Sequence, residues 1–299
     1  MIYTVTLNPA LDYTMHLDAL SQGSTNRSAR ESVTFGGKGI NVSAVLRELG
    51  LPSVVLGFAA GFTGRELCRL LDEAGLSHKL VMLEEGMTRI NVKLRADRET
   101  EINAGGPAVR DGELNRLLEQ LEGLTEEDTL VLAGSVPAGV PSRIYEQILS
   151  RLAGKGVRVV VDTEPKWMKG LLPYRPFLVK PNRAELSAFV GRELHDEEEL
   201  LSAARELQRL GAQNVLVSLG GDGALLLDDA GEVRRAAAMG GKPIGTVGAG
   251  DSMVACFLFG VSTDKDNALR YALAAGGATA TGEGIATAAR IYAVLGLPD

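Results

Sequence analysis

The sequence is poor in cysteine, with two in 299 residues, Cys68 and Cys256. Each lies within an apolar helical pattern, so we expect small buried side chains rather than a disulfide framework. This cysteine usage favours a reducing, cytoplasmic setting. The chain opens with MIYTVTLNP, a strand pattern without a basic region or a long apolar segment, which argues against a secretory signal.

Long apolar runs and basic clusters are also missing. The longest apolar stretch near the C-terminus, IATAARIYAVLGLP, is interrupted by Arg290 and is too short to cross a bilayer. A net charge of -7 without a local basic stripe gives a field that repels nucleic acid and anionic lipid. We therefore expect no membrane and no nucleic-acid partner. The three histidines, His16, His78 and His195, are scattered and lack the spacing of a zinc site.

What the sequence does contain is an alternation of apolar strands and amphipathic helices. Strands are predicted at IYTVTL, SVVLGFA, TLVLAG, VRVVVD and NVLVS, and helices at GINVSAVLRELG, TGRELCRLLDEAG and PSRIYEQILSRLAGKG. For the second of these helices, Thr63 is the expected N-cap and Gly75 marks the end. Near-continuous apolar strands are typical of a parallel sheet that is covered on both faces. The alternation therefore predicts βαβ units around a parallel sheet.

Two segments depart from this alternation, at about residues 12–35 and 88–106. In the second, RINVKLRA and ETEINA alternate in polarity and are joined by a polar turn at Asp97 and Arg98. Strands without crossover helices predict a small antiparallel sheet that lies over the main one as a lid. No repeat and no Pro/Ser-rich linker divides the chain, so we expect a single domain over residues 1–299.

Three glycine-rich loops are candidates for the chemistry: FGGKGIN (35–41), SLGGDGA (218–224) and IGTVGAGDSMVACF (244–257). None of them matches a Walker A loop. None matches the GxGxxG dinucleotide fingerprint with its downstream acidic residue, which weighs against a dinucleotide-dependent oxidoreductase.

The third loop places Asp251 ahead of an apolar run, and we expect a helix to start near this residue. Gly248 and Gly250 free the backbone, so that several amides can converge on an anion at the helix N-terminus. Asp251 is then either a helix cap or a base beside a bound phosphoryl group. The glycines favour the base, because a cap does not require them.

GGKGINVS and VGAGDSMVACF resemble the two signatures of the ribokinase-like, or PfkB, carbohydrate kinases, and TLNPALDY, AGSVPAGVP, KPNRAE and SLGGDGA occur in the order of that family. The resemblance implies a ribokinase-like three-layer α/β/α sandwich with a mostly parallel central sheet and a small β-sheet lid. It also implies ATP and Mg²⁺ as cofactors. Because unpaired sheet edges invite a partner strand, we expect a homodimer formed through the lid strands.

Within the family, TLNPALDY, GFTGREL, TRINVKL and ETEIN are most similar to the enzymes that convert fructose 1-phosphate to fructose 1,6-bisphosphate with ATP. INAGGP departs from the more usual IN-x-P-GP pattern of that subgroup. Kinases for tagatose 6-phosphate or fructose 6-phosphate are the near alternatives. A non-catalytic sugar-phosphate sensor is a more distant one.

The resemblance also assigns roles to residues. It implies that Asp251 is the general base on the sugar hydroxyl, while the amides of Gly248, Ala249 and Gly250 stabilise the charge that develops on the γ-phosphoryl group. The residues implied for the sugar hydroxyls are Asp12, Gly36, Gly37, Asn41 and Asn103, and those for the substrate phosphate are Lys38, Arg89 and, more weakly, Arg27. From the residues alone, the two glycines also fit a tight turn, Arg89 an exposed cross-strand charge and Asn103 a turn.

The resemblance also implies which residues bind the nucleotide. The resemblance implies that Lys180 contacts the ATP phosphates and that Ser218, Gly220 and Gly223 line the nucleotide. It implies that Asn182 and Glu185 orient water around Mg²⁺, although Asn followed by Glu three residues later also predicts a capping box. Small residues of 274–280 are expected to form the adenine pocket.

Overall fold

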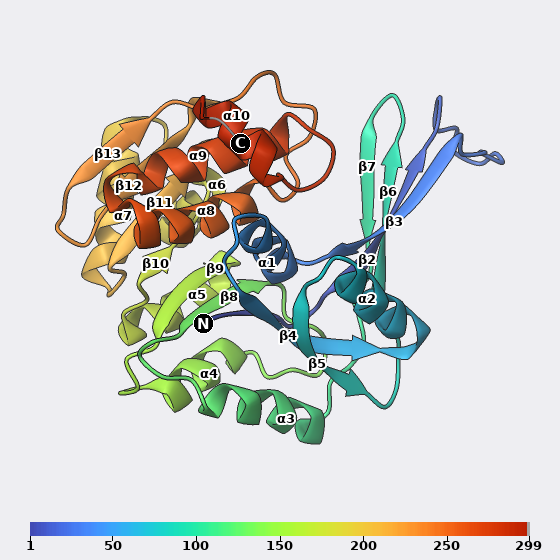
Figure 1. Cartoon of the computed structure of the whole chain (residues 1–299), viewed down its shortest axis with the longest axis horizontal. Helices are drawn as coiled ribbons and strands as arrows, with labels where there is room; N and C mark the ends of the chain where they lie inside the picture. The colour runs from blue at the N-terminus through green and yellow to red at the C-terminus, as the bar shows by residue number, and fades with distance from the viewer. Residues whose placement is uncertain (298–299) are drawn as a thin grey trace.

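The computed structural model describes residues 1–297 and contains two sheets of unequal size (Figure 1). The strands of the large sheet are β1 (Ile2–Thr6), β4 (Ser53–Ala60), β5 (Ser77–Leu83), β8 (Thr129–Gly134), β9 (Arg158–Thr163), β10 (Leu178–Val179), β11 (Asn214–Ser218), β12 (Ala224–Leu227) and β13 (Val233–Ala236). They lie in the order β13-β12-β11-β10-β9-β8-β1-β4-β5. All neighbours up to β11 pair in parallel, and β12 and β13 add an antiparallel edge. The expected mostly parallel sheet is confirmed.

Helices cover both faces of this sheet. One face carries α3 (Asp111–Glu122), α4 (Ile144–Leu152), α5 (Pro165–Leu171), α6 (Arg183–Val190) and α7 (Glu197–Arg209), and the other carries α1 (Lys38–Glu48), α2 (Gly61–Glu73), α8 (Ala249–Thr263), α9 (Ala268–Ala280) and α10 (Ala288–Leu295). Short 3₁₀ turns are η1 (Leu172–Tyr174), η2 (Gly220–Asp222) and η3 (Lys265–Asn267). In β8, Leu130 and Leu132 pack into one core cluster while Val131 and Ala133 pack into the other. Burial on both faces explains the continuous apolar strands.

The start of α2 differs from the prediction. The helix begins at Gly61, so Thr63 lies inside its first turn and is not the N-cap. The buried Thr63 hydroxyl instead donates a hydrogen bond to the Thr88 carbonyl at 2.8 Å, which ties the helix to the chain that enters the lid. Gly75, with φ of 63°, follows the end of the helix as predicted.

The lid is a four-stranded sheet in the order β3-β2-β6-β7, made by β2 (Ala10–His16), β3 (Arg30–Gly36), β6 (Arg89–Arg95) and β7 (Glu99–Asn103). Each half is an antiparallel hairpin, but β2 and β6 pair in parallel. The prediction of a wholly antiparallel lid is therefore wrong. Both hairpins project from the body of the molecule on the same side (Figure 1), so their first strands run outward together.

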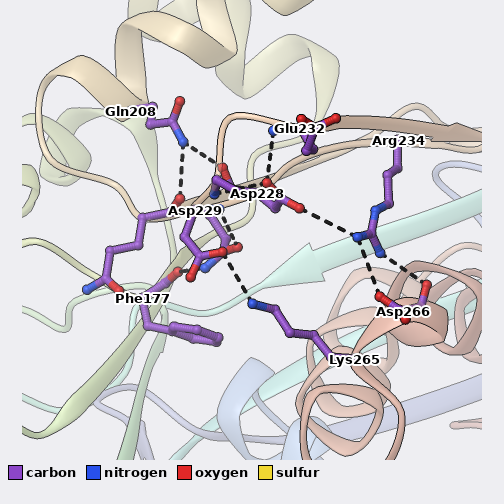
Figure 2. A network of polar contacts seen from close by, with 11 residues as sticks. Phe177, Gln208, Asp228, Asp229, Glu232, Arg234, Lys265 and Asp266 are labelled. Carbon is purple, nitrogen blue, oxygen red and sulfur yellow. Dashed lines mark hydrogen bonds and ion pairs between the residues drawn. The ribbon is translucent and has the colours of Figure 1, made fainter.

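A polar network anchors the β12–β13 hairpin at the edge of the large sheet (Figure 2). The buried Asp228 carboxylate accepts hydrogen bonds from the backbone amides of Ala230 and Glu232 at 3.0 and 2.9 Å. The Gln208 side chain donates to the Asp228 carbonyl at 2.7 Å, and Arg234 lies 3.7 Å from the carboxylate. The hairpin is thereby fixed to α7, and its first strand follows directly after η2.

The structure also bears on the two cysteines and on membrane-spanning helices. Cys256 in α8 is buried, but Cys68 in α2 is only partly so, because it lies at the flank of an amphipathic helix; both are free thiols. Within residues 1–297, no helix combines the length and the apolar character needed to cross a membrane.

Candidate active site

A cavity of about 730 Å³ lies at the carboxyl ends of the parallel strands, beneath the lid. Asp162 comes from the end of β9, Lys180 follows β10 and Ser218 ends β11, while Asp12 and Asn91 come from the lid. In an open α/β sheet, the loops at the carboxyl ends of the strands form the crevice where ligands bind. The cavity therefore lies where this topology places a ligand.

Most of the predicted site residues line this one cavity. They are Asp12, Gly37, Lys38, Asn41, Arg89, Asn103, Lys180, Asn182, Glu185, Ser218, Gly220, Gly223, Gly248, Ala249, Gly250 and Asp251. Two do not. Arg27 is exposed in the loop between β2 and β3, and Gly36 lies behind Asp12 instead of on the cavity wall. A Cβ at Gly36 would lie 2.5 Å from Asp12 Oδ1, so this glycine makes room for the carboxylate.

The helix that carries Asp251 begins at Ala249, close to Asp251 as predicted. Gly248, in the left-handed region at φ of 79°, is the N-cap of α8, and Asp251 lies in the first turn. Asp251 is therefore not a cap. Its buried carboxylate accepts a hydrogen bond from Asn41 Nδ2 at 2.8 Å. The Ala249 amide donates to the Thr246 carbonyl at 3.2 Å, so it is already engaged, contrary to the expectation that three amides are free.

The environment of Asp251 suits a base. Its pKa is raised to about 6: burial is the largest cause and the charge of Asp162 adds to it, while Lys38, the hydrogen bond from Asn41 and Lys180 act in the opposite direction. A general base works best when its pKa lies near the operating pH and it is still ionised there. Asp251 meets both conditions at neutral pH.

Asp162 is a functional candidate that sequence reasoning missed. Its Oδ1 lies 3.1 Å from Lys38 Nζ and 3.4 Å from Lys180 Nζ, and its buried Oδ2 has no hydrogen-bond partner among residues 1–297. Burial alone raises the pKa of the Asp162 carboxyl, but the two ammonium groups outweigh it and hold the pKa below its ordinary value. The available signal was its position, a charged residue at the end of the apolar strand VRVVVD.

The two lysines occupy different places around this carboxylate. Lys180 is buried, and a Cβ on Gly250 would lie 3.0 Å from its ammonium, so this cation borders the start of α8. Burial lowers the pKa of Lys38, but the charges of Asp162, Asp251 and Glu185 raise it above its ordinary value. A helix N-terminus and at least one ammonium group thus converge on the same space, which is an arrangement for binding an anion.

Arg89 marks a second anion-binding region toward the lid. Its Nε donates to the Asn8 carbonyl at 3.1 Å, and within residues 1–297 it makes no ion pair. Burial lowers the pKa of Arg89, which the charge of Asp12 partly offsets. Arg89 and Lys38 also line a smaller pocket of about 270 Å³ together with Asn8 and Ser135. A half-buried guanidinium without a carboxylate partner favours an anionic ligand.

Asp12 is held in place by two lid side chains that sequence reasoning did not single out. Asn91 Nδ2 donates to Asp12 Oδ1 at 2.9 Å, and Lys93 Nζ lies 2.7 Å from Asp12 Oδ2. The alternation of β6 places Asn91 and Lys93 on the same face, as residues two apart on a strand. That spacing, in RINVKL, was the available signal.

Asn182 and Glu185 form the predicted capping box at the start of α6. Asn182 Oδ1 accepts from the Glu185 amide at 2.9 Å, and Glu185 Oε2 accepts from the Asn182 amide at 2.8 Å. In the described part of the chain, no group of three His, Cys, Asp or Glu residues is arranged to hold a metal. The unpartnered Asp162 oxygen and Glu185 fit Mg²⁺ that is bound mainly by phosphate and water.

The nucleotide side of the cavity is formed by glycine loops and one face of α9. Of the 274–280 stretch, Gly276, Gly277 and Ala280 line the cavity, whereas Ala274 and Ala275 are buried in the core. Small residues of the stretch therefore line the cavity from one face of α9, while the other face packs in the core. Their place in the adenine pocket stays a prediction. The loop 238–243 supplies the remaining wall.

A buried carboxylate at a helix N-terminus, flanked by cations and covered by a lid at the carboxyl ends of parallel strands, defines an α/β enzyme of phosphoryl transfer. The family model described as pfkB family carbohydrate kinase matches residues 5–291, and the chain belongs to this family. The predicted family, the ribokinase-like fold and kinase activity are thereby confirmed.

Individual relatives agree over nearly the whole chain. The chain is 41% identical to a 1-phosphofructokinase of Bacillus subtilis, covering 96% of this chain and 95% of that protein. It is 36% identical to a D-tagatose-1-phosphate kinase of Bacillus licheniformis, with 97% and 96% covered. Among solved structures, phosphofructokinase-2 from Escherichia coli in complex with substrates and products superposes with a TM-score of 0.93 at 30% identity, covering 99% and 98%.

Proposed function

We propose that this protein transfers the γ-phosphoryl group of ATP to the 6-hydroxyl of fructose 1-phosphate and produces fructose 1,6-bisphosphate and ADP. The observation that carries the proposal is that one cavity is lined by Asp251 and by two anion-binding regions: the start of α8 with Lys180, and Arg89. A substrate that already bears a phosphate, and a donor that brings another, would occupy these two regions. The similarity to a 1-phosphofructokinase supports the choice of sugar.

In the proposed reaction, the Asp251 carboxylate takes the proton of the acceptor hydroxyl. The resulting oxygen attacks the γ-phosphorus of ATP, and the bond from that phosphorus to the β-phosphate oxygen breaks, which releases ADP. Asn41 holds the carboxylate in one orientation through its 2.8 Å hydrogen bond. Lys180 and the amides of Gly248 and Gly250 stabilise the charge on the travelling group without reorganising.

The remaining assignments complete the site. We assign Asp12, Asn103 and the backbone at Gly37 to the sugar hydroxyls, and Arg89, Lys38, Asn8 and Ser135 to the substrate phosphate. Ser218, Gly220 and Gly223 line the nucleotide. Mg²⁺, which would neutralise phosphate charge, would be held through water by Glu185, Asn182 and Asp162.

We further propose that residues 1–299 act as one domain whose lid closes over the sugar and excludes water, which limits wasteful ATP hydrolysis. A cytoplasmic location remains a prediction from the cysteine usage.

The lid also supports the proposed homodimer. Its strands alternate, so the face opposite the cavity carries Tyr13, Val33, Val92, Leu94 and Ile102. Val33 and Ile102 are 43% and 59% exposed. A second copy that covered this face would remove apolar surface from water.

A second candidate substrate is tagatose 1-phosphate, because a relative at 36% identity is named for it. The two sugars differ in the configuration of one ring hydroxyl. The arrangement of anion-binding regions fits both equally well.

The test is an ADP-coupled assay with purified protein over fructose 1-phosphate, tagatose 1-phosphate, fructose 6-phosphate and tagatose 6-phosphate. We expect the highest kcat/KM for fructose 1-phosphate, because specificity is expressed in this ratio. A preference for either 6-phosphate would contradict the proposal. ATP consumption without a sugar-dependent rate would contradict it as well.

A further inference from the structure

We propose that Lys93 is a positioning residue that sets the affinity for the sugar ring by acting through Asp12. The inference rests on the proposed function and deepens it, since it assigns part of the sugar specificity to a lysine in the middle of lid strand β6. Lys93 makes one ion pair within residues 1–297, and that ion pair is with Asp12.

The ion pair is enclosed. The Lys93 and Asp12 side chains are only 12% and 13% exposed, and their charged atoms are 2.7 Å apart. Both residues line the cavity. An exposed lysine on a sheet surface keeps its ammonium in water, so the burial of Lys93 is unusual for a solvated strand position.

The ion-pair partner of Lys93 also distinguishes its proposed role from ordinary stabilisation of the sheet. Lys93 lies directly opposite Glu101 in the register of β6 and β7, and oppositely charged residues at such positions normally pair across the strands. The ammonium of Lys93 instead lies on Asp12 of the other neighbouring strand, diagonally across the parallel pair β2 and β6. Lys93 therefore contacts Asp12, the residue that we assign to the sugar hydroxyls, and not Glu101.

The contacts around Asp12 leave defined hydrogen-bonding capacity for a ligand. Asn91 occupies one lone pair of Oδ1, and Lys93 occupies one of Oδ2, so each oxygen keeps acceptor capacity for a hydroxyl. The absence of a side chain at Gly36 leaves room for the carboxylate in this position. This geometry suits two neighbouring ring hydroxyls of a ketose phosphate.

Without Lys93, the Asp12 carboxylate would lose the contact that fixes one of its oxygens. Binding of the ring hydroxyls would then weaken in the ground state and in the transition state alike. Such a loss of uniform binding raises KM and leaves kcat nearly unchanged.

The experiment compares Lys93→Met, Lys93→Arg, Asp12→Asn and the double variant Lys93→Met/Asp12→Asn with the wild type. The readouts are kcat and KM for fructose 1-phosphate, calorimetric binding of the same sugar, and thermal melting. Lys79→Met, an exposed lysine on β5 outside the cavity, is the matched control.

We expect Lys93→Met to raise KM about 10- to 100-fold, the range for a lost charge-assisted hydrogen bond, with kcat within a few-fold. Lys93→Arg should recover part of the affinity because it keeps the charge. The double variant should bind little more weakly than Asp12→Asn alone, because Lys93 acts through Asp12. Lys79→Met should match the wild type.

Three results would overturn the inference while leaving the proposed function intact: an unchanged KM in Lys93→Met, a fall in kcat alone, or additive effects in the double variant. Lower thermal stability with unchanged KM belongs to the first result and would mean a purely structural ion pair. If the wild type neither binds nor phosphorylates fructose 1-phosphate, the proposed function and this inference both fail.

Discussion

Replacement of Asp251 by asparagine should abolish most of the activity and at the same time stabilise the folded protein. Asparagine keeps the shape of the side chain, and its oxygen can still accept the hydrogen bond from Asn41, but it cannot take a proton from the sugar hydroxyl. We expect kcat to fall by about 10²- to 10⁴-fold, the range for loss of a general base.

The gain in stability follows from the raised pKa of Asp251. The pKa rises from 3.8 to about 6, mainly through burial, so the folded state holds the proton more tightly than the unfolded state. The contribution of this group to folding is therefore fully favourable below pH 3.8 and is lost as the pH rises through about 6. The rise of about two pH units, at about 1.4 kcal/mol each, means that the ionised carboxylate costs about 3 kcal/mol at pH 8.

The Asp251→Asn variant carries no such charge. It should be more stable than the wild type by about 3 kcal/mol at pH 8, and the difference should shrink as the pH falls from 8 to 5. The wild-type kcat/KM should decrease about tenfold per pH unit below pH 6, because this ratio reports the groups of the free enzyme. The residual activity of the variant should lack that decrease.

The assays are ADP-coupled kinetics from pH 5 to 8 and chemical denaturation at the same pH values, without nucleotide. Asp111→Asn, on the exposed first turn of α3, is the matched control; it should leave kcat unchanged and should not stabilise the protein, because a carboxylate at a helix N-terminus is favourable. A variant with normal turnover would refute the role of Asp251 as a base. A less stable variant at pH 8 would refute the account of its buried charge.

Other perturbations test other parts of the molecule. Gly36→Ala would place a Cβ 2.5 Å from the Asp12 carboxylate and should raise the sugar KM by about 10-fold or more, measured by steady-state kinetics. Ile102→Lys should disrupt the proposed homodimer, because it places a charge on the outer apolar face of the lid, and light scattering should show the monomer mass. Asp228→Ala should leave kcat unchanged but destabilise the protein by about 1–3 kcal/mol in denaturant melts, because two backbone amides lose their acceptor.

Each of these has a control within the chain. Gly112→Ala, where the added Cβ would meet no atom of residues 1–297 within 4 Å apart from its chain neighbours and its own helix backbone, should leave KM unchanged. Phe62→Lys, which alters an exposed apolar residue outside the lid, should keep the dimer. Asp229→Ala removes only an exposed ion pair and should cost less than Asp228→Ala. Equal effects in a variant and its control would contradict the corresponding prediction, as would a wild-type protein that is already monomeric.

The predicted strands and helices follow closely from local patterns, since apolar runs, alternation and glycines act over a few residues. Their exact ends do not follow. Thr63 looked like a cap but binds the Thr88 carbonyl from inside the helix, and Asp251 also fitted a cap, although Gly248 is the N-cap of its helix. A partner far away in the sequence decided the first boundary, and the left-handed φ of a glycine decided the second.

The active site was likewise only partly predictable from the sequence. Sequence motifs placed most of the predicted residues in one cavity, because the carboxyl ends of parallel strands meet at one edge of the sheet. They did not single out Asp162 or Lys93, whose importance comes from charges brought beside them by other strands. The sequence of α9 also did not show which side of the helix lines the cavity, since a run of small residues does not tell which of its members face the core.

The sequence by itself therefore determined the order of strands and helices, the lid segments and the chemical groups in the glycine loops, because these depend on neighbouring residues. Only the tertiary structure decided the electrostatics: a buried carboxylate with a pKa near 6, a second one held ionised between two lysines, and an arginine without a carboxylate partner in the described chain. Burial and charge–charge distances set these properties, and both are fixed by contacts between segments that are remote in the sequence.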